Sequence, residues 1–274
     1  MAVTPLASTS ASASPDPGPE GLPPLFAGLP DVFAGFFSPA APWMLLGEAL
    51  DAVLAALPSD DIQVRLLPEV HLAGDRIAIG RGCRIHPGVV IEGPIAIGRD
   101  VEIRPGAYLR GGVWIGDGCV VGASTEIKRA ILLAGAKAPH LNYVGDSILG
   151  QGVNLGAGTI LSNFRHDGRE VRIPAGVAGR RVSGGSREPG SGGDAGERGR
   201  YPQSPPAIAS GRRKLGAVLG DGVQTGCNCV LHPGVVVGRD TQIYPGVQLR
   251  PGIYPAGSLI KLRQEIEIVA QSDR

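Results

Sequence analysis

Residues 77–133 have the sequence IAIGRGCRIHPGVVIEGPIAIGRDVEIRPGAYLRGGVWIGDGCVVGASTEIKRAILL and decide the fold. An aliphatic residue returns here at every sixth position: Ile79, Ile85, Ile91, Ile97, Ile103, Leu109, Ile115, Val121, Ile127 and Leu133. A second row of small or branched residues lies two positions earlier in each unit, beginning with Ile77 and Cys83. An α-helix repeats about every 3.6 residues and a strand every two, so neither explains this period. Hexapeptide repeats are typical of a parallel β-helix.

The composition agrees with an all-β solenoid. The chain has 274 residues with 43 glycines and 24 prolines, and only 4% of its residues are aromatic, which suits tight turns around an aliphatic interior. A net charge of +1 gives no reason to expect nucleic acid or a membrane surface as a partner. No apolar stretch approaches the ~20 residues of a transmembrane helix. The N-terminus lacks the basic start and apolar core of a secretory signal.

The cysteines indicate a reducing compartment. Cys83, Cys119 and Cys229 occupy the small inward position of the repeat, where we expect buried thiols. Cys227 and Cys229 form a CxC pair without the second pair that a zinc site would need. We therefore predict a cytoplasmic location.

Two segments precede the repeats. Residues 1–23 are rich in Ser, Ala, Pro and Gly and are predicted to be a disordered tail. Residues 24–70 are predicted to form a helical cap, with a helix over residues 42–57 that has Pro42 in its first turn. Its apolar residues recur at helical spacing from Met44 to Leu57. An uncovered β-helix end exposes unpaired strand edges, so we expect this segment to cover the open end of the solenoid. A partner-binding helix is the alternative.

The repeats are predicted to form one domain over residues 71–274, with three hexapeptides to a coil. The row stops after Leu133, since Pro139 stands at the next position, and it resumes out of phase at Leu149. Residues 136–146 are therefore predicted to leave the coil as a loop. A second row adds about two coils: Leu219, Thr225, Leu231, Val237, Ile243 and Leu249.

Between the two rows, residues 179–211 have low complexity and no apolar period. We predict a disordered surface insertion there. Its basic residues are either solvated or in contact with a phosphate ligand.

His140 lies in the segment where the period breaks. A histidine near its usual pKa of ~6.5 is a natural general base for removing a proton from an amine. A catalytic His140 and a surface histidine both remain open on this spacing. His86 and His232 precede Pro-Gly at repeat corners and are expected to be structural. Gamma-class carbonic anhydrases bind zinc through histidines of which two are five residues apart, and no such pair occurs here, so no metal is predicted.

Two motifs resemble a known family. KAPHLNYVGD at residues 137–146 and VNLGAGT at residues 153–159 resemble the acetyltransferase domain of the bifunctional glucosamine-1-phosphate acetyltransferase/uridyltransferase. SNFR at residues 162–165 and GRRKLGA at residues 211–217 look more like the archaeal-type fused enzymes. The resemblance covers about residues 77–255. It implies a left-handed parallel β-helix that assembles as a homotrimer, with acetyl-CoA as acyl donor and an amino-sugar 1-phosphate as acceptor.

The resemblance also assigns roles to single residues. His140 takes the place of the catalytic base. The substrate-binding positions fall on Arg110, Lys128, Tyr143, Asn154 and Asn163. The acetyl-CoA positions fall on Ala157 and on Cys227, where the family often has serine. The eighteen residues between Arg110 and Lys128 equal one coil, so both would lie on one face as a cationic pair able to hold a phosphate. A solvated outer face is the alternative for these charges.

The sequence also departs from this family. The glycine-rich start of a nucleotidylyltransferase half is absent from it, Phe164 replaces a tyrosine, and Gly111 replaces a proline. We expect an acetyl-CoA-dependent N-acetyltransferase acting on an amino-sugar phosphate, glucosamine 1-phosphate first, in UDP-N-acetylhexosamine synthesis. One alternative is an acyltransferase for a nucleotide-linked amino sugar. Another is a non-catalytic trimeric scaffold that binds a sugar phosphate or a separate nucleotidylyltransferase.

Overall fold

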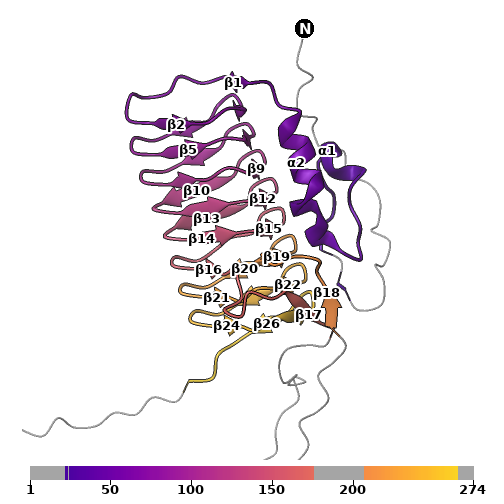
Figure 1. The fold of residues 1–274 in the computed structure, drawn as a ribbon. Coiled ribbons are helices and arrows are strands. Elements are labelled where there is room, and N and C mark those ends of the chain that lie inside the picture. The colour runs from indigo at the N-terminus through magenta and orange to yellow at the C-terminus, as the bar shows by residue number, and fades with distance from the viewer. Residues whose placement is uncertain (1–21, 24, 176–206, 265–274) are drawn as a thin grey trace, which may run out of the picture.

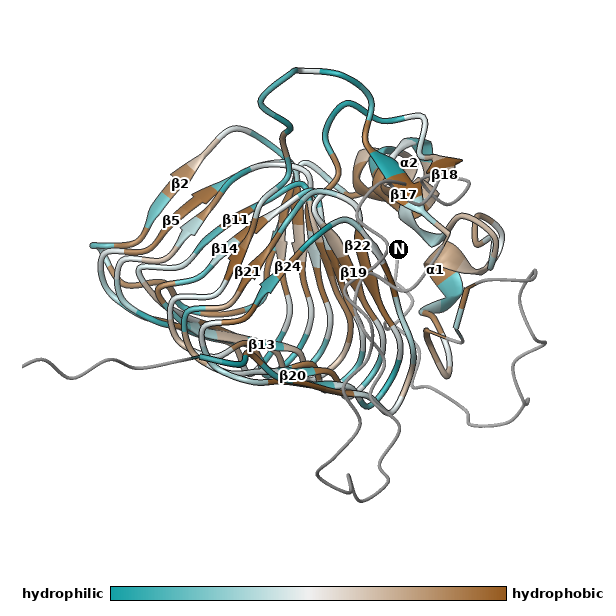
Figure 2. Ribbon diagram, turned by 90° about the horizontal axis from the view of Figure 1, so that it is seen from below, coloured by the Kyte–Doolittle hydropathy of each residue, from teal (hydrophilic) through white to brown (hydrophobic). Residues whose placement is uncertain are grey.

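The computed structural model describes residues 22–23, 25–175 and 207–264. The predicted tail, except for Leu22 and Pro23, lies outside the described residues, as do positions 176–206 of the insertion region. The chain winds into a solenoid whose short strands stack into three parallel sheets, and the sheets form the sides of a triangular prism (Figures 1 and 2).

The three sheets are named A, B and C. Sheet A runs β1 (Asp60–Ile62), β3 (Ile77–Ile79), β6 (Ile95–Ile97), β9 (Val113–Ile115), β12 (Ile131–Leu132), β15 (Ile148–Leu149), β19 (Ala217–Leu219), β22 (Val235–Val237) and β25 (Gly252–Tyr254). Sheet B runs β2 (His71–Ala73), β5 (Val90–Glu92), β8 (Tyr108–Leu109), β11 (Glu126–Lys128), β14 (Tyr143–Gly145), β16 (Ile160–Leu161), β21 (Val230–Leu231) and β24 (Gln248–Leu249). Sheet C has two parts, β4 (Arg84–Ile85), β7 (Glu102–Ile103), β10 (Val120–Ala123) and β13 (Lys137–His140), then β20 (Gln224–Thr225), β23 (Gln242–Ile243) and β26 (Leu259–Ile260). Asn154 bridges these two parts, pairing with Lys137 on one side and Gln224 on the other.

The interior is the predicted aliphatic row. Residues from Ile79 to Ile127 at every sixth position are all buried and form one core cluster. Successive coils bond through their backbones, as where the Arg110 N–H donates to the Ile127 carbonyl at 2.8 Å. Cys119, in the second row of small residues, is fully buried, and burial raises the pKa of its thiol to about 12, so it is an unreactive core residue. All four cysteines are unpaired.

The predicted loop over residues 136–146 is wrong. Residues 137–140 form β13, which pairs with β10, and residues 143–145 form β14, which pairs with β11. The inward row continues through Ala138 and Val144. The chain therefore stays in the coil throughout this segment.

The phase slip comes from two corners that are each one residue short. Leu109 pairs with Ile127, eighteen residues on, whereas Ile115 pairs with Leu132, only seventeen on. Leu132 rather than Leu133 therefore faces the interior. The same loss recurs between Val144 and Leu149, so the two short corners lie at Arg129 and Asp146, whose φ angles are 46° and 44°.

The helical segment covers a flank of the solenoid rather than its end. It comprises α1 (Asp31–Ala34), the 3-10 helix η1 (Pro42–Leu46) and α2 (Glu48–Ala55), so the predicted helix over residues 42–57 is interrupted at Gly47. Its apolar side chains pack against outward residues of sheet A, where the Phe33 ring lies 5.4 Å from the Trp114 ring, centre to centre. Figure 2 shows the helices beside β19 and β22.

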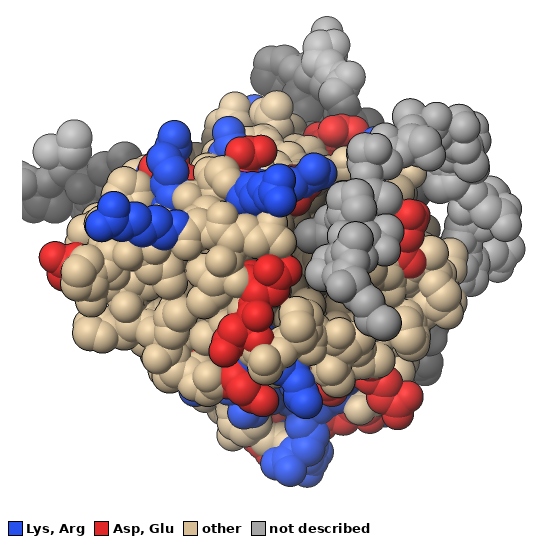
Figure 3. All heavy atoms as spheres, turned by 90° about the horizontal axis from the view of Figure 1, so that it is seen from above, with Lys and Arg blue, Asp and Glu red and all other residues tan. Residues whose placement is uncertain are grey.

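The end of the first coil is covered by its own lead-in. Val64, Leu66 and Val70 pack against the main core there. Figure 3 shows this end from above, with acidic and basic side chains spread over it. The prediction that the helices cap the end failed because sheet A has an apolar outer face, which gives their apolar side a much larger surface to bury.

Part of the predicted insertion is ordered. The strands β17 (Arg172–Pro174) and β18 (Ala207–Ala209) pair in antiparallel fashion beside the last coils of sheet A. The Ser210 hydroxyl then donates to the Val171 carbonyl. The chain therefore returns to the solenoid at residues 207–214 along a fixed path.

Candidate active site

Arg110 and Lys128 lie one above the other on the outer face of sheet B, as predicted. Arg110 follows β8 and Lys128 ends β11, and the pairing of Leu109 with Ile127 sets the two in register. Arg110 donates to a Glu126 carboxylate oxygen at 2.9 Å, and its guanidinium carbon lies 5.8 Å from the centre of the Tyr108 ring. The arginine is thus held in place on the surface by a neighbouring carboxylate and a neighbouring ring.

Lys214 adds a third cation to this pair. The backbone of Lys214 bridges that of Phe164 where the chain returns from the insertion. Burial, the Lys214 ammonium and the Arg110 guanidinium together lower the pKa of Lys128. Lys128 and Lys214 form no ion pair among the described residues, and crowded cations of this kind are a suitable site for a multiply charged anion such as a phosphate ester.

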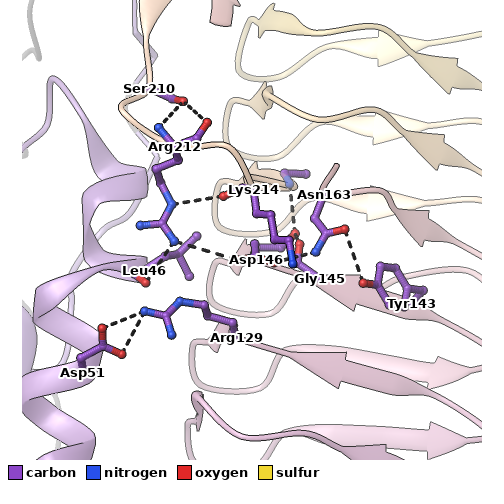
Figure 4. A network of polar contacts seen from close by, with 12 residues as sticks. Leu46, Asp51, Arg129, Tyr143, Gly145, Asp146, Asn163, Ser210, Arg212 and Lys214 are labelled. Atoms are coloured by element: carbon purple, nitrogen blue, oxygen red, sulfur yellow. Dashed lines mark hydrogen bonds and ion pairs between the residues drawn. The ribbon is translucent and has the colours of Figure 1, made fainter. Parts of the chain in front are cut away.

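Tyr143 and Asn163 lie beside Lys214 (Figure 4), and the charge of Arg110 also acts on Tyr143. The Tyr143 hydroxyl donates to Asn163 Oδ1 at 3.4 Å, and Asn163 Nδ2 donates to the buried Asp146 carboxylate at 2.6 Å. Gly145 makes room for them, because a Cβ there would lie 2.7 Å from both the Asn163 amide nitrogen and the Tyr143 hydroxyl. Burial, followed by Glu126 and Asp146, raises the pKa of Tyr143, so its hydroxyl stays a hydrogen-bond donor at neutral pH.

His140 ends β13 at the edge where sheet C turns into sheet B, and its side chain is exposed. The corner is fixed by Asn142, whose Oδ1 accepts the His140 backbone N–H at 3.1 Å and whose Nδ2 donates to the Gly156 carbonyl at 2.9 Å. Among the described residues the imidazole has no hydrogen-bond partner. A rigid corner therefore presents a ring whose nitrogens are open to a ligand.

Ala157 and Cys227 follow His140 along the same edge. The Gly158 N–H donates to the His140 carbonyl at 3.1 Å, and the Asn228 N–H donates to the Ala157 carbonyl at 2.8 Å, so the three corners stack on successive coils. The N–H groups of Gly156 and Gly158 are bonded, whereas that of Ala157 has no partner among the residues described. Cys227 is exposed.

Asn154 is not brought to this group. It lies on the outer face of sheet C, between the inward Val153 and Leu155. Tyr143 lies on sheet B and Asn163 just beyond it, so within one chain the two predicted sugar-binding asparagines belong to different sides of the prism.

Sequence reasoning missed four residues of this region. Glu126, Asp146 and Lys214 contact or act on predicted substrate residues, and Arg212 contacts Asp146. Lys214 and Arg212 belong to the GRRKLGA motif, which carried a resemblance without an assigned role. No pattern in the sequence showed that Asp146, in an exposed-looking Val-Gly-Asp corner, would be 2% exposed.

No group of three or more His, Cys, Asp or Glu is placed to hold a metal ion in residues 22–23, 25–175 and 207–264. None of the helices in those ranges is long and apolar enough to cross a bilayer.

Comparison with known proteins finds similarity to hexapeptide-repeat transferases. A family model of the GMPPB C-terminal domain matches residues 91–183, and a model of six bacterial transferase hexapeptide repeats matches residues 216–251. The coils and these repeats identify the fold as the predicted left-handed parallel β-helix.

Three similar curated proteins support the predicted resemblance. A bifunctional sugar-1-phosphate nucleotidylyltransferase/acetyltransferase of Sulfurisphaera tokodaii is 40% identical over 126 residues, covering 46% of this chain and 24% of that protein. The bifunctional protein GlmU of Methanocaldococcus jannaschii is 34% identical over 123 residues, covering 45% and 23%. The bifunctional protein GlmU of a Synechococcus strain is 30% identical over 207 residues, covering 70% and 35%. The resemblance is confirmed, and the chain matches about a quarter to a third of the length of these relatives.

A solved structure was also matched. A perosamine N-acetyltransferase from Caulobacter crescentus, in complex with CoA and GDP-perosamine, is 20% identical, with 38% of this chain and 45% of that chain covered and a TM-score of 0.17.

Proposed function

We propose that the protein is an acetyl-CoA-dependent N-acetyltransferase whose acceptor is an amino-sugar phosphate, glucosamine 1-phosphate first. The observation that carries this is the group of cations formed by Arg110, Lys128 and Lys214 beside Tyr143 and Asn163. Arg110 and Lys128 lie on sheet B, which the chain enters directly after the corner at His140. A phosphate on the cations would leave the sugar beside two neutral hydrogen-bonding groups.

His140 acts as the general base. Its imidazole takes a proton from the sugar ammonium, and the resulting amine attacks the thioester carbonyl, forming a C–N bond. The C–S bond then breaks, and the thiolate takes a proton as the free thiol of CoA. The exposed, unpaired ring is available for this proton transfer.

Ala157 is the candidate donor to the oxyanion. Its N–H is unpaired among the described residues and stands one coil from His140 on the same edge. A fixed backbone N–H facing the place where negative charge develops stabilises the transition state. Cys227 would line the same edge one coil further along, as part of the path for acetyl-CoA.

The position of Asn154 supports a homotrimer. One chain places Asn154 and Asn163 on different sides of the prism, so both can hold one sugar only if a second copy supplies Asn154. An arrangement in which sheet C of one copy faces sheet B of the next would do so. A separate nucleotidylyltransferase as partner and a cytoplasmic location both stay predictions.

A nucleotide-linked amino sugar is the second candidate acceptor. An open groove of about 520 Å³ continues along sheet B past the cations, lined by Ser162, Phe164, His166 and His232 among others. Phe164 is 45% exposed there and offers a face on which a base could stack. The scaffold alternative loses support, because Ala49, Leu50 and Leu54 of α2 are buried against this chain's own sheet A.

The test is an assay of free thiol release from acetyl-CoA. The acceptors are glucosamine 1-phosphate, glucosamine 6-phosphate, galactosamine 1-phosphate and UDP-glucosamine. Release with glucosamine 1-phosphate at the highest kcat/KM supports the proposal, and preference for UDP-glucosamine supports the second candidate. Release with none of them, from folded protein of defined oligomeric state, would refute both.

A further inference from the structure

Asp146 is a buried carboxylate at the second short corner. It is 2% exposed, and it accepts a hydrogen bond from Asn163 Nδ2 at 2.6 Å. A carboxylate taken out of water needs a cation or several donors to offset its lost hydration. The nearest cation is Arg212, whose Nη2 lies 3.9 Å from the other oxygen of Asp146.

Arg212 joins three separate segments of the chain (Figure 4). Its Nη2 also donates to the carbonyl of Leu46, at the end of η1, at 3.4 Å. Its Nε donates to the Lys214 carbonyl at 3.3 Å. The Arg212 side chain is only 16% exposed, and burial lowers the pKa of its guanidinium while Asp146 opposes that shift. One planar group with fixed donors thus contacts the helices, the Lys214 segment and Asp146.

The same contacts fix the orientation of Asn163. A carboxylate only accepts hydrogen bonds, so Asp146 requires that the NH₂ side of the Asn163 amide point toward it. The Asn163 oxygen then faces the Tyr143 hydroxyl, which donates to it at 3.4 Å. If Asp146 were displaced, Asn163 would be free to flip, and its pairing with Tyr143 would be lost.

We propose that Arg212 is a positioning residue that couples the N-terminal helices to the sugar-phosphate site. Through Asp146 it sets the orientation of Asn163 and Tyr143. Through the hydrogen bond from its Nε to the Lys214 carbonyl it fixes the position of Lys214. This rests on the proposed function, since it assigns those three residues to the acceptor. It makes residues 25–57 part of the acceptor site rather than a cover for sheet A alone.

A second ion pair provides the matched control. Arg129 donates to the Asp51 carboxylate at 2.7 Å, so it also ties α2 to the solenoid. Asp51 is 55% exposed and makes no hydrogen bond to Asp146, Asn163 or Lys214 among the described contacts. The Asp51→Asn variant therefore loosens the same helices while removing none of the contacts of Arg212, on which Asp51 acts only through its charge.

The experiment measures steady-state kinetics of Arg212→Ala, Arg212→Lys, Asp146→Asn and Asp51→Asn with the best acceptor. Because lost hydrogen bonds to charged groups reduce affinity by about 10- to 100-fold, Arg212→Ala and Asp146→Asn should raise the KM for the acceptor by that factor. The KM for acetyl-CoA should stay within about twofold. Arg212→Lys should fall in between, because a single ammonium cannot span the Leu46 and Lys214 carbonyls. Asp51→Asn should change neither KM by more than about twofold.

Equilibrium binding separates this proposal from the proposed function. Glucosamine 1-phosphate is titrated calorimetrically into wild type and variants without acetyl-CoA, and Tm is recorded for each. If wild type binds the sugar phosphate but acetylates nothing, the transferase assignment fails while the positioning can still be scored from Kd. Wild-type KM and Kd in both Arg212→Ala and Asp146→Asn would overturn the positioning role. So would an equal loss in Asp51→Asn, which would reduce Arg212 to an anchor for the helices.

Discussion

The coils up to Ile127 and those from Lys128 to Asn163 share one core but differ at their corners and on their surfaces. In the regular coils, surface charges pair across one coil, as Arg84 does with Glu102 at 3.3 Å and Arg99 with Asp117 at 3.0 Å. Around the two short corners, Arg212 lies against the buried Asp146, and the charges of Arg110 and Lys214 both act on Lys128. The backbone ladder is the same in both regions, so they differ in their corners and in the charges on their surfaces.

The largest effect should come from His140. Replacing it by alanine removes a general base, which contributes about 10²- to 10⁴-fold to a rate. We expect kcat to fall by that factor while the KM for the acceptor changes little, measured by thiol release from acetyl-CoA. His86 lies on the same edge in the regular coils, beside Glu102 at 3.6 Å, and provides the control. Comparable losses in both variants would remove the distinction between the two regions.

Lys128 should show a loss of binding without a loss of stability. Lys128→Met removes a charge-assisted hydrogen bond, so the acceptor should bind about 10- to 100-fold more weakly. Tm should stay the same or rise, because burial, Lys214 and Arg110 already disfavour the lysine's charge in the folded state. Calorimetry gives the Kd for the acceptor, and thermal unfolding gives Tm. A fall in Tm with unchanged Kd would mean that Lys128 is structural.

Much of the fold could be predicted because each strand of the β-helix places an apolar residue in the interior, and these residues recur at a fixed spacing in the sequence. The row was misassigned only where the outer face is also apolar. Leu132 and Leu133 are both buried, one in the core and the other beneath the helices, so polarity could not tell them apart. Knowing that helices cover sheet A was necessary for placing the short corner at Arg129.

The candidate site was predictable where it depended on coil spacing. Arg110 and Lys128 are close because they are one coil apart, and His140 and Ala157 because their corners stack. Lys214 and Arg212 reach the site only after the chain has left the solenoid and returned beside Phe164. Such a contact depends on the path of the returning segment, and no period in the sequence encodes it.

The acceptor's affinity should depend on pH in the alkaline range. The pKa of Lys128 is lowered, so its charge is lost as pH rises through a value below the ~10.4 of an ordinary lysine. Affinity for glucosamine 1-phosphate should therefore be full near neutral pH and should decline severalfold before ordinary lysines titrate. Lys214→Met removes one source of the shift and should move the decline to higher pH. Loss of affinity at the same pH in wild type and Lys214→Met would contradict this.

The smallest effect should come from a charge pair of the regular coils. Arg84 contacts Glu102 while its side chain is 73% exposed, and exposed pairs contribute about 0–1 kcal/mol because water screens them. Arg84→Gln should thus lower the free energy of unfolding by less than ~1 kcal/mol in urea. It should leave acceptor Kd unchanged, since Arg84 lies on sheet C, whereas Arg110 and Lys128 lie on sheet B. A weaker Kd in Arg84→Gln would mean that the cationic site extends from sheet B onto sheet C of the regular coils.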